Sequence, residues 1–221
     1  GMGKSTLCQW LALNWSQECC KQSCVESCIH QYDLLFYLNA REFVGHQSMQ
    51  ALIVQALDCN INSEEINSQL GRSKVAFVVD GFDEVKKGTA PLLVKFIEGT
   101  VMPSSTLILT SRSQFLTQNL RSFDSLFSLS GMDASQRQEY LQKLSQQIEM
   151  KSKALTTLQQ RMNGDLNDFS NNPMIVTIMC LLCSVLNDSD LPKTLTGIYS
   201  AIHEFMITKS AKRLNCSKLD I

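Results

Sequence analysis

The sequence lacks an excess of charge of either sign. Its 20 lysines and arginines are balanced by 21 aspartates and glutamates, which gives a net charge of −1. Proteins that attract a nucleic-acid backbone or an acidic membrane surface through bulk electrostatics are usually basic. The composition therefore indicates neither a nucleic-acid partner nor a membrane-surface partner.

Long hydrophobic runs are also missing. The longest nearly unbroken apolar stretch extends from Ile175 to Leu186, whereas a helix needs about 20 residues to cross a bilayer. No transmembrane segment is therefore predicted, and this stretch predicts a buried helix instead.

Matched cysteine pairs are absent, although the chain has nine cysteines. An odd number scattered unevenly along a chain favours free thiols in a reducing compartment, so we expect a cytoplasmic protein. A local cluster lies between Cys19 and Cys28, but its spacing is not that of the paired C-x₂-C motifs that bind zinc. The sequence does not predict a role for this cluster.

A glycine-rich phosphate-binding motif, GMGKST, opens the chain. Glycine lets backbone N–H groups approach a phosphate closely, and the positive end of the following helix faces the same anion. We expect Gly1 and Gly3 to form this loop and Lys4 to reach the β- and γ-phosphates. The Ser5 hydroxyl would complete the shell of a Mg²⁺ ion, and Thr6 would lie beside the α-phosphate.

The motif is incomplete at its start. The full pattern, G-x-x-x-x-G-K-[ST], needs a further glycine three positions before Gly1. We therefore expect the sequence to begin inside the motif and to lack the strand that leads into it. The alternative is an ordinary glycine turn before a helix, but the helical spacing of Leu7, Trp10 and Leu11 favours the phosphate loop.

An apolar run that ends in acidic residues, VAFVVDGFDE, forms the second motif. Strands buried on both faces carry such runs, and the active groups of open α/β sheets gather at the carboxyl ends of the strands. We predict that Asp80 holds Mg²⁺ through its water shell. Glu84, or else Asp83, would polarise the water that attacks the γ-phosphate. The alternative is a solvated acidic turn.

A third strand, TLILT, leads to Arg112. An arginine at this strand end is predicted to contact the γ-phosphate, and the alternative is a surface arginine. Strands alternate with helices in this part of the chain, which indicates an α/β fold with a parallel sheet covered on both faces. Strands are expected at residues 33–39, 75–79, 106–110 and 125–129, helices at 48–58 and 91–98, and a surface connection at 60–74.

The sequence becomes helical after residue 131. Ser135 and Gln138 are expected to form a capping box at the start of the first of these helices. Pro173 is suited to the first turn of the apolar helix that follows it, and a last amphipathic helix is expected from Leu195 to Met206.

Five segments resemble, in their order and spacing, the NACHT NTPases of the NOD-like receptor type, which are STAND P-loop ATPases: GMGKSTL, VVDGFDEV, LILTSRS, NNPMIVTIMCLL and TLTGIYSAIHEFMI. The resemblance covers almost the whole chain. It implies a P-loop nucleotide-binding α/β domain at residues 1–131, a helical domain at 132–186 and the beginning of a winged-helix domain at 187–221. It also implies that Pro173 packs on the adenine base.

The resemblance further implies a function. Such a module binds ATP or ADP with Mg²⁺ and hydrolyses ATP slowly. It acts as a nucleotide-dependent switch for self-association in an intracellular, innate-immune-like receptor. The effector and sensor domains of such a receptor are expected to lie outside this sequence. No N-K-x-D guanine motif is present, which favours adenine. Two other hypotheses stay open, a mechanical ATPase of the AAA type and a nucleotide-binding scaffold without hydrolysis.

Overall fold

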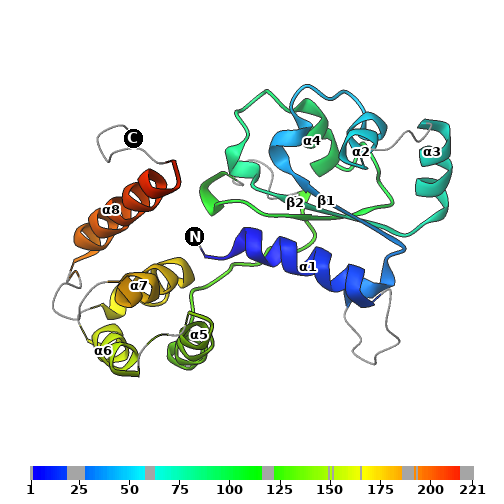
Figure 1. Ribbon diagram of the computed structural model, residues 1–221. Helices are drawn as coiled ribbons and strands as arrows, with labels where there is room; N and C mark the ends of the chain where they lie inside the picture. The colour runs from blue at the N-terminus through cyan, green and yellow to red at the C-terminus, as the bar shows by residue number, and fades with distance from the viewer. Residues whose placement is uncertain are drawn as a thin grey trace. The chain divides into compact units, whose positions relative to one another are not determined.

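The computed structural model divides the chain into two compact units. Lys4–Ser128 form an α/β unit, and Leu129–Ile221, grouped with Gly1–Gly3, form a helical unit (Figure 1). None of the described helices is long and apolar enough to cross a membrane. The structure describes residues 2–18, 28–57, 63–115, 122–148, 150, 152–164, 166–185, 192 and 194–214.

Three parallel strands form the sheet of the α/β unit. They are β1 (Leu34–Asn39), β2 (Val75–Asp80) and β3 (Thr106–Leu109), arranged in the order β1-β2-β3. All six residues of β2 are buried, because this strand has a neighbour on each edge and helices over both faces. The strands predicted from the apolar runs at residues 33–39, 75–79 and 106–110 are confirmed.

Helices cover both faces of the sheet. Helix α1 (Lys4–Glu18) lies on one face, and α2 (Met49–Leu57) and α4 (Pro91–Ile97) lie on the other (Figure 1). Successive side chains of a strand point to opposite faces. Along β2, Phe77 points into the core beneath α2 and α4, whereas Asp80 points toward α1, where it meets Cys8. The predicted α/β fold is confirmed.

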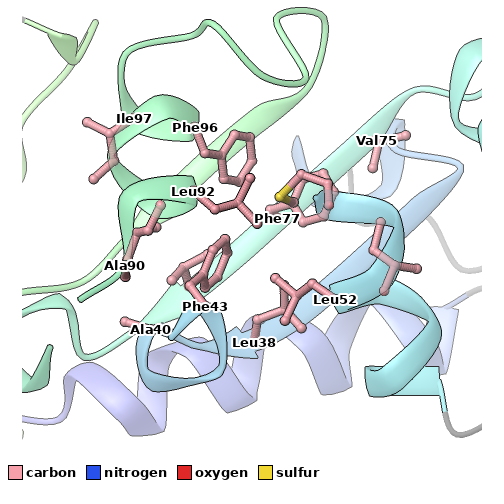
Figure 2. Close-up of a cluster of buried hydrophobic side chains, with 14 of the residues drawn as sticks. Leu38, Ala40, Phe43, Leu52, Val75, Phe77, Ala90, Leu92, Phe96 and Ile97 are labelled. Atoms are coloured by element: carbon pink, nitrogen blue, oxygen red, sulfur yellow. The ribbon is translucent and has the colours of Figure 1, made fainter. Parts of the chain in front are cut away.

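Aromatic rings fill the core between the sheet and helices α2 and α4 (Figure 2). The Phe77 ring is fully buried and meets Phe96 edge-on, with ring centroids 5.0 Å apart. It also stacks on Phe36 at 5.1 Å. Aromatic contacts of this kind stabilise a core beyond the area that they bury, so β2 and its carboxyl end have a rigid support.

A further helix, α3 (Ser63–Arg72), replaces part of the predicted surface connection at residues 60–74. Ile66 and Leu70 lie one turn apart and pack on the core. Glu64 and Glu65 occupy the first turn and Arg72 the last, which complements the helix dipole. The prediction was wrong because two apolar residues among many polar ones are a weak helical signal.

The strand predicted at residues 125–129 is not formed. The described residues there have no regular secondary structure, and the side chains of Leu126 and Phe127 are 65% and 90% exposed. A strand needs a neighbour for its N–H and C=O groups, and these residues have no strand partner in the described sheet.

Among its described residues, the helical unit has four α-helices: α5 (Ala134–Gln147), α6 (Ser152–Asn163), α7 (Pro173–Val185) and α8 (Leu195–Leu214). Their apolar faces form one core. The buried helix predicted from the apolar run is α7. The capping box of α5 is formed by Asp133 and Gln136 rather than by Ser135 and Gln138, because the helix begins earlier than predicted.

The thiols of Cys8, Cys180 and Cys183 form no disulfide, and all three are buried. Burial raises the pKa of Cys180 to about 12, and the neighbouring Cys183 adds to this rise. Cys180 and Cys183 are therefore core residues of α7. The side chains of the Cys19–Cys28 cluster lie outside the described residues.

Candidate functional site

The predicted phosphate loop leads directly into α1. Gly1 lies outside the described residues, but Gly3 has a φ of +88°, a conformation that glycine adopts without strain. Helix α1 begins at the next residue, so Lys4, Ser5 and Thr6 form its first turn. The backbone N–H groups of a first turn have no partner within the helix, which leaves them available to an anion.

Asp80 lies at the carboxyl end of β2 and is only 8% exposed. Its Oδ1 accepts a hydrogen bond from the Thr110 hydroxyl at 2.5 Å, and the Cys8 thiol lies 3.8 Å from the same oxygen. Burial, with a further contribution from the charge of Asp80, raises the pKa of Cys8 to about 11. The thiol therefore stays protonated at neutral pH and acts as a donor.

The contact of Cys8 with Asp80 also orients α1. Residues three and four apart share one face of a helix, so Ser5 and Lys4 lie on the same side of α1 as Cys8, one turn nearer to its N-terminus. None of the described residues donates a hydrogen bond to Asp80 Oδ2. A hydroxyl and a carboxylate oxygen are the kind of ligands that Mg²⁺ takes in nucleotide sites, so the residues present fit the ion.

The turn after β2 is fixed to the end of β3. Gly81 has a φ of +79°, and its N–H donates to the Thr110 hydroxyl oxygen at 3.1 Å. The Phe82 N–H donates to the Thr110 carbonyl at 2.9 Å. A side chain on Gly81 would meet Glu84 Cδ at 3.2 Å, so the positive φ favours glycine, and a larger residue would also displace the Glu84 side chain slightly.

Asp83 and Arg112 hold each other. Asp83 Oδ1 accepts from the Arg112 backbone N–H at 3.1 Å, and Oδ2 lies 3.1 Å from Arg112 Nε. The Asp83 side chain is only 11% exposed. A carboxylate whose two oxygens are both engaged, one of them by a guanidinium, has little room to bind the attacking water. This geometry favours a role for Asp83 in positioning Arg112.

Glu84 is the more accessible of the two acidic residues. Its side chain is 52% exposed, and its Oε2 lies 3.0 Å from Nε of Arg41, which belongs to the 3₁₀ turn Ala40–Phe43 after β1. Exposed ion pairs of this kind contribute little energy. The geometry therefore leaves Glu84 as the better candidate for accepting a proton from water.

Sequence reasoning missed three residues of this site: Cys8, Arg41 and Thr110. Each of them lies close to Asp80 or Glu84 only because strands and helices distant in the sequence come together. Pro173, the predicted adenine contact, is the first residue of α7 in the helical unit, where Asn172 Oδ1 accepts from the Met174 N–H at 3.0 Å. Its contact with adenine stays a prediction.

Comparisons with known proteins identify the family of the chain. The family model described as NACHT domain matches residues 1–147. The human MHC class II transactivator is 29% identical over 192 residues, which cover 76% of this chain and 16% of that protein. Human NACHT, LRR and PYD domains-containing protein 2 is 29% identical over 136 residues, covering 52% of this chain and 12% of that protein.

A more distant relative, NLR family CARD domain-containing protein 4 of Xenopus tropicalis, is 21% identical over 219 residues, covering 97% of this chain and 21% of that protein. The chain thus spans between 12% and 21% of the length of these relatives. The match over residues 1–147 shows that the chain belongs to the NACHT family, and its α/β unit is a nucleotide-binding module of the P-loop NTPase type.

Proposed function

We propose that this chain is the ATP-binding and slowly hydrolysing switch of a larger NOD-like receptor. The observation that carries the proposal is the buried Asp80 at the end of β2, with one oxygen held by neutral donors and the other without a donor among the described residues. Membership of the NACHT family supports the nucleotide. The absence of a guanine motif from the sequence favours ATP and ADP.

The residues of the proposed nucleotide site then take the following roles. Backbone N–H groups of the loop at Gly1 and Gly3 and of the first turn of α1 bind phosphate oxygens, together with the Lys4 ammonium. Mg²⁺, when bound, would neutralise charge on the β- and γ-phosphates. Ser5 and Asp80 would hold that ion, the latter through water.

The chemical step depends on the residues after β2 and β3. Glu84 orients and deprotonates the attacking water, and Arg112 contacts the γ-phosphate once it leaves Asp83. From the family resemblance we also propose that Pro173 packs on adenine and that residues 187–221 begin a winged-helix domain. Loss of the γ-phosphate would release Arg112 and so distinguish the ADP state from the ATP state.

Two substitutions in the full-length protein test the site. Lys4→Ala is expected to abolish ATP binding, because it removes more than one charge-assisted contact with phosphate, each worth roughly 1.5–3 kcal/mol. Glu84→Gln should leave binding intact and slow hydrolysis by about 10²- to 10⁴-fold. Glu98→Gln, an exposed residue after α4, is the matched control. The role of Glu84 is wrong if Glu84→Gln loses nucleotide as completely as Lys4→Ala.

The switch is tested by measuring ATP turnover and self-association of the same full-length protein. The buffer contains a reductant so that the cysteines stay reduced. We expect very slow, partner-dependent turnover, monomers with ADP, and self-association with ATP. Sustained turnover without a partner would instead identify a mechanical ATPase, and ATP binding with no turnover would identify a scaffold.

A further inference from the structure

We propose that Thr110 is the positioning residue that turns Asp80 toward the Mg²⁺ ion of a bound nucleotide. This inference rests on the nucleotide site proposed above. Thr110 directly follows β3 and is 8% exposed. It makes a side-chain contact with Asp80, which the sequence places 30 residues earlier.

The hydroxyl of Thr110 has a fixed direction. A threonine hydroxyl carries one hydrogen and can accept through its oxygen. Its hydrogen goes to Asp80 Oδ1, and its oxygen accepts from the Gly81 N–H at 3.1 Å. Asp80 accepts the hydrogen of this hydroxyl, and Gly81 donates a hydrogen to its oxygen. Rotation of the Thr110 side chain about χ1 would break both hydrogen bonds.

The backbone of Thr110 fixes the position of that hydroxyl. Its N–H donates to the Val79 carbonyl at 2.9 Å, and its carbonyl accepts from the Phe82 N–H at 2.9 Å. These bonds tie Thr110 to the residues on both sides of Asp80 and Gly81. Threonine is also β-branched, which restricts its χ1 angle. The donor is therefore held in place before any nucleotide binds.

The consequence concerns the two oxygens of Asp80. The contacts from Thr110 and Cys8 both reach Oδ1, so they anchor this oxygen and leave Oδ2 without a donor among the described residues. Without the Thr110 hydroxyl, the weak thiol donor of Cys8 would be left to orient a buried charge. Hydrogen bonds to metal-binding groups from outside the coordination shell are typically worth about 10- to 100-fold in metal affinity.

Three threonine variants of the full-length protein test the proposal. Thr110→Val keeps the shape and removes the hydroxyl, Thr110→Ser restores a hydroxyl, and Thr106→Val is the matched control. Thr106 stands at the other end of β3, where its hydroxyl oxygen accepts from the Tyr32 hydroxyl at 3.0 Å. Calorimetric titration of ATP, once with Mg²⁺ and once with EDTA, gives the gain in affinity that the ion supplies.

Thr110→Val is expected to reduce the Mg²⁺-dependent gain by about 10-fold, the lower end of this range, because Asp80 would hold the ion through water. Affinity in EDTA should stay unchanged. Thr110→Ser and Thr106→Val should keep the wild-type gain. If Thr110→Val does not fold, Thr110→Cys is used instead. A thiol is a poor hydrogen-bond donor, and cysteine is close in size to serine. Thr110→Cys should show the same loss of the Mg²⁺-dependent gain in ATP affinity.

The outcomes separate this inference from the proposed function. A wild-type protein whose ATP affinity does not respond to Mg²⁺ would overturn the nucleotide site itself. A wild-type response that persists in Thr110→Val or Thr110→Cys would overturn only the role of Thr110. An equal loss in Mg²⁺ and in EDTA, or an equal loss in Thr106→Val, would show that Thr110 merely supports the fold.

Discussion

Each unit of the chain buries one charged side chain without an opposite charge beside it among the described residues. In the α/β unit this residue is Asp80, and in the helical unit it is Arg137; both are 8% exposed. Asp80 receives the hydroxyl of Thr110 and the thiol of Cys8. Burial of a charge is costly unless hydrogen bonds compensate for the lost water, so the two sites invite comparison.

The guanidinium of Arg137 joins three segments. Nη2 donates to Asn163 Oδ1 at 3.0 Å at the end of α6, and Nη1 donates to Ser170 Oγ and to Asn167 Oδ1 in the turns before α7. Asp80 differs because both of its contacts reach one oxygen. The bonds of Arg137 therefore tie segments of the helical unit together, whereas Asp80 keeps one oxygen without a donor among the described residues, and this is the oxygen that we propose for the cation.

The largest expected effect on stability is at Arg137. Arg137→Met removes the donor of Asn163, Asn167 and the buried Ser170, and we expect the helical unit to lose about 3 kcal/mol. Asp80→Asn should cost far less, because a neutral amide needs less solvation than a carboxylate. Hydrogen exchange of the α5 and α6 amides measures the loss in Arg137→Met, and hydrogen exchange of the β2 amides measures the loss in Asp80→Asn. Arg72→Met, at an exposed residue of α3, is the control. Equal losses of stability in the two variants would contradict the difference between Arg137 and Asp80.

The neutral donor Cys8 gives a pH dependence. Its pKa is raised from the ordinary 9.0 to about 11, so the unfolded thiol ionises before the folded one does. Ionisation of this thiol therefore leaves the free energy of unfolding unchanged below about pH 9 and lowers it increasingly between about pH 9 and 11. A difference of about two pKa units corresponds to at most about 3 kcal/mol. Cys8→Ala should remove this part of the alkaline loss, and identical alkaline unfolding of the two proteins would contradict the burial of a protonated thiol.

Glycine substitutions distinguish backbone strain from crowding at the turn after Asp80. Gly81→Ala is expected to cost about 1–2 kcal/mol for its positive φ, and its new methyl group would also displace Glu84. Gly88 has a φ of +82° and open space around it, so Gly88→Ala has the strain alone. Denaturation should show the larger loss for Gly81→Ala, and only this variant should slow hydrolysis. Equal behaviour of the two variants would argue against the contact with Glu84.

The smallest expected effect is at the exposed ion pair of Arg41 and Glu84, whose side chains are 69% and 52% exposed. Arg41→Gln should change stability by less than about 1 kcal/mol, and high salt should remove the difference. Denaturant unfolding at low and high salt measures it. A loss comparable to that of Arg137→Met would mean that the pair is far better shielded than the structure shows.

Elements that depend on a continuous pattern of neighbouring residues could be predicted from the sequence. The apolar run before Asp80 identified β2 and its carboxyl end, since a strand buried on both faces has to be apolar throughout. Thr110 and Cys8 could not be found in this way, because their contacts with Asp80 depend on how β3 and α1 pack. The strand predicted at residues 125–129 was wrong because apolar residues such as Leu126 do not form a strand without a neighbouring strand to hydrogen-bond.

The role that we propose for the buried Asp80 is to hold the cation of a nucleotide. Titrating ATP into the full-length wild-type protein and into Asp80→Asn, with Mg²⁺ and with EDTA, tests it most directly. We predict equal ATP affinity of the two proteins in EDTA, tighter binding by the wild type once Mg²⁺ is added, and no such gain in Asp80→Asn. A variant that folds and gains as much affinity from Mg²⁺ as the wild type would contradict the claim.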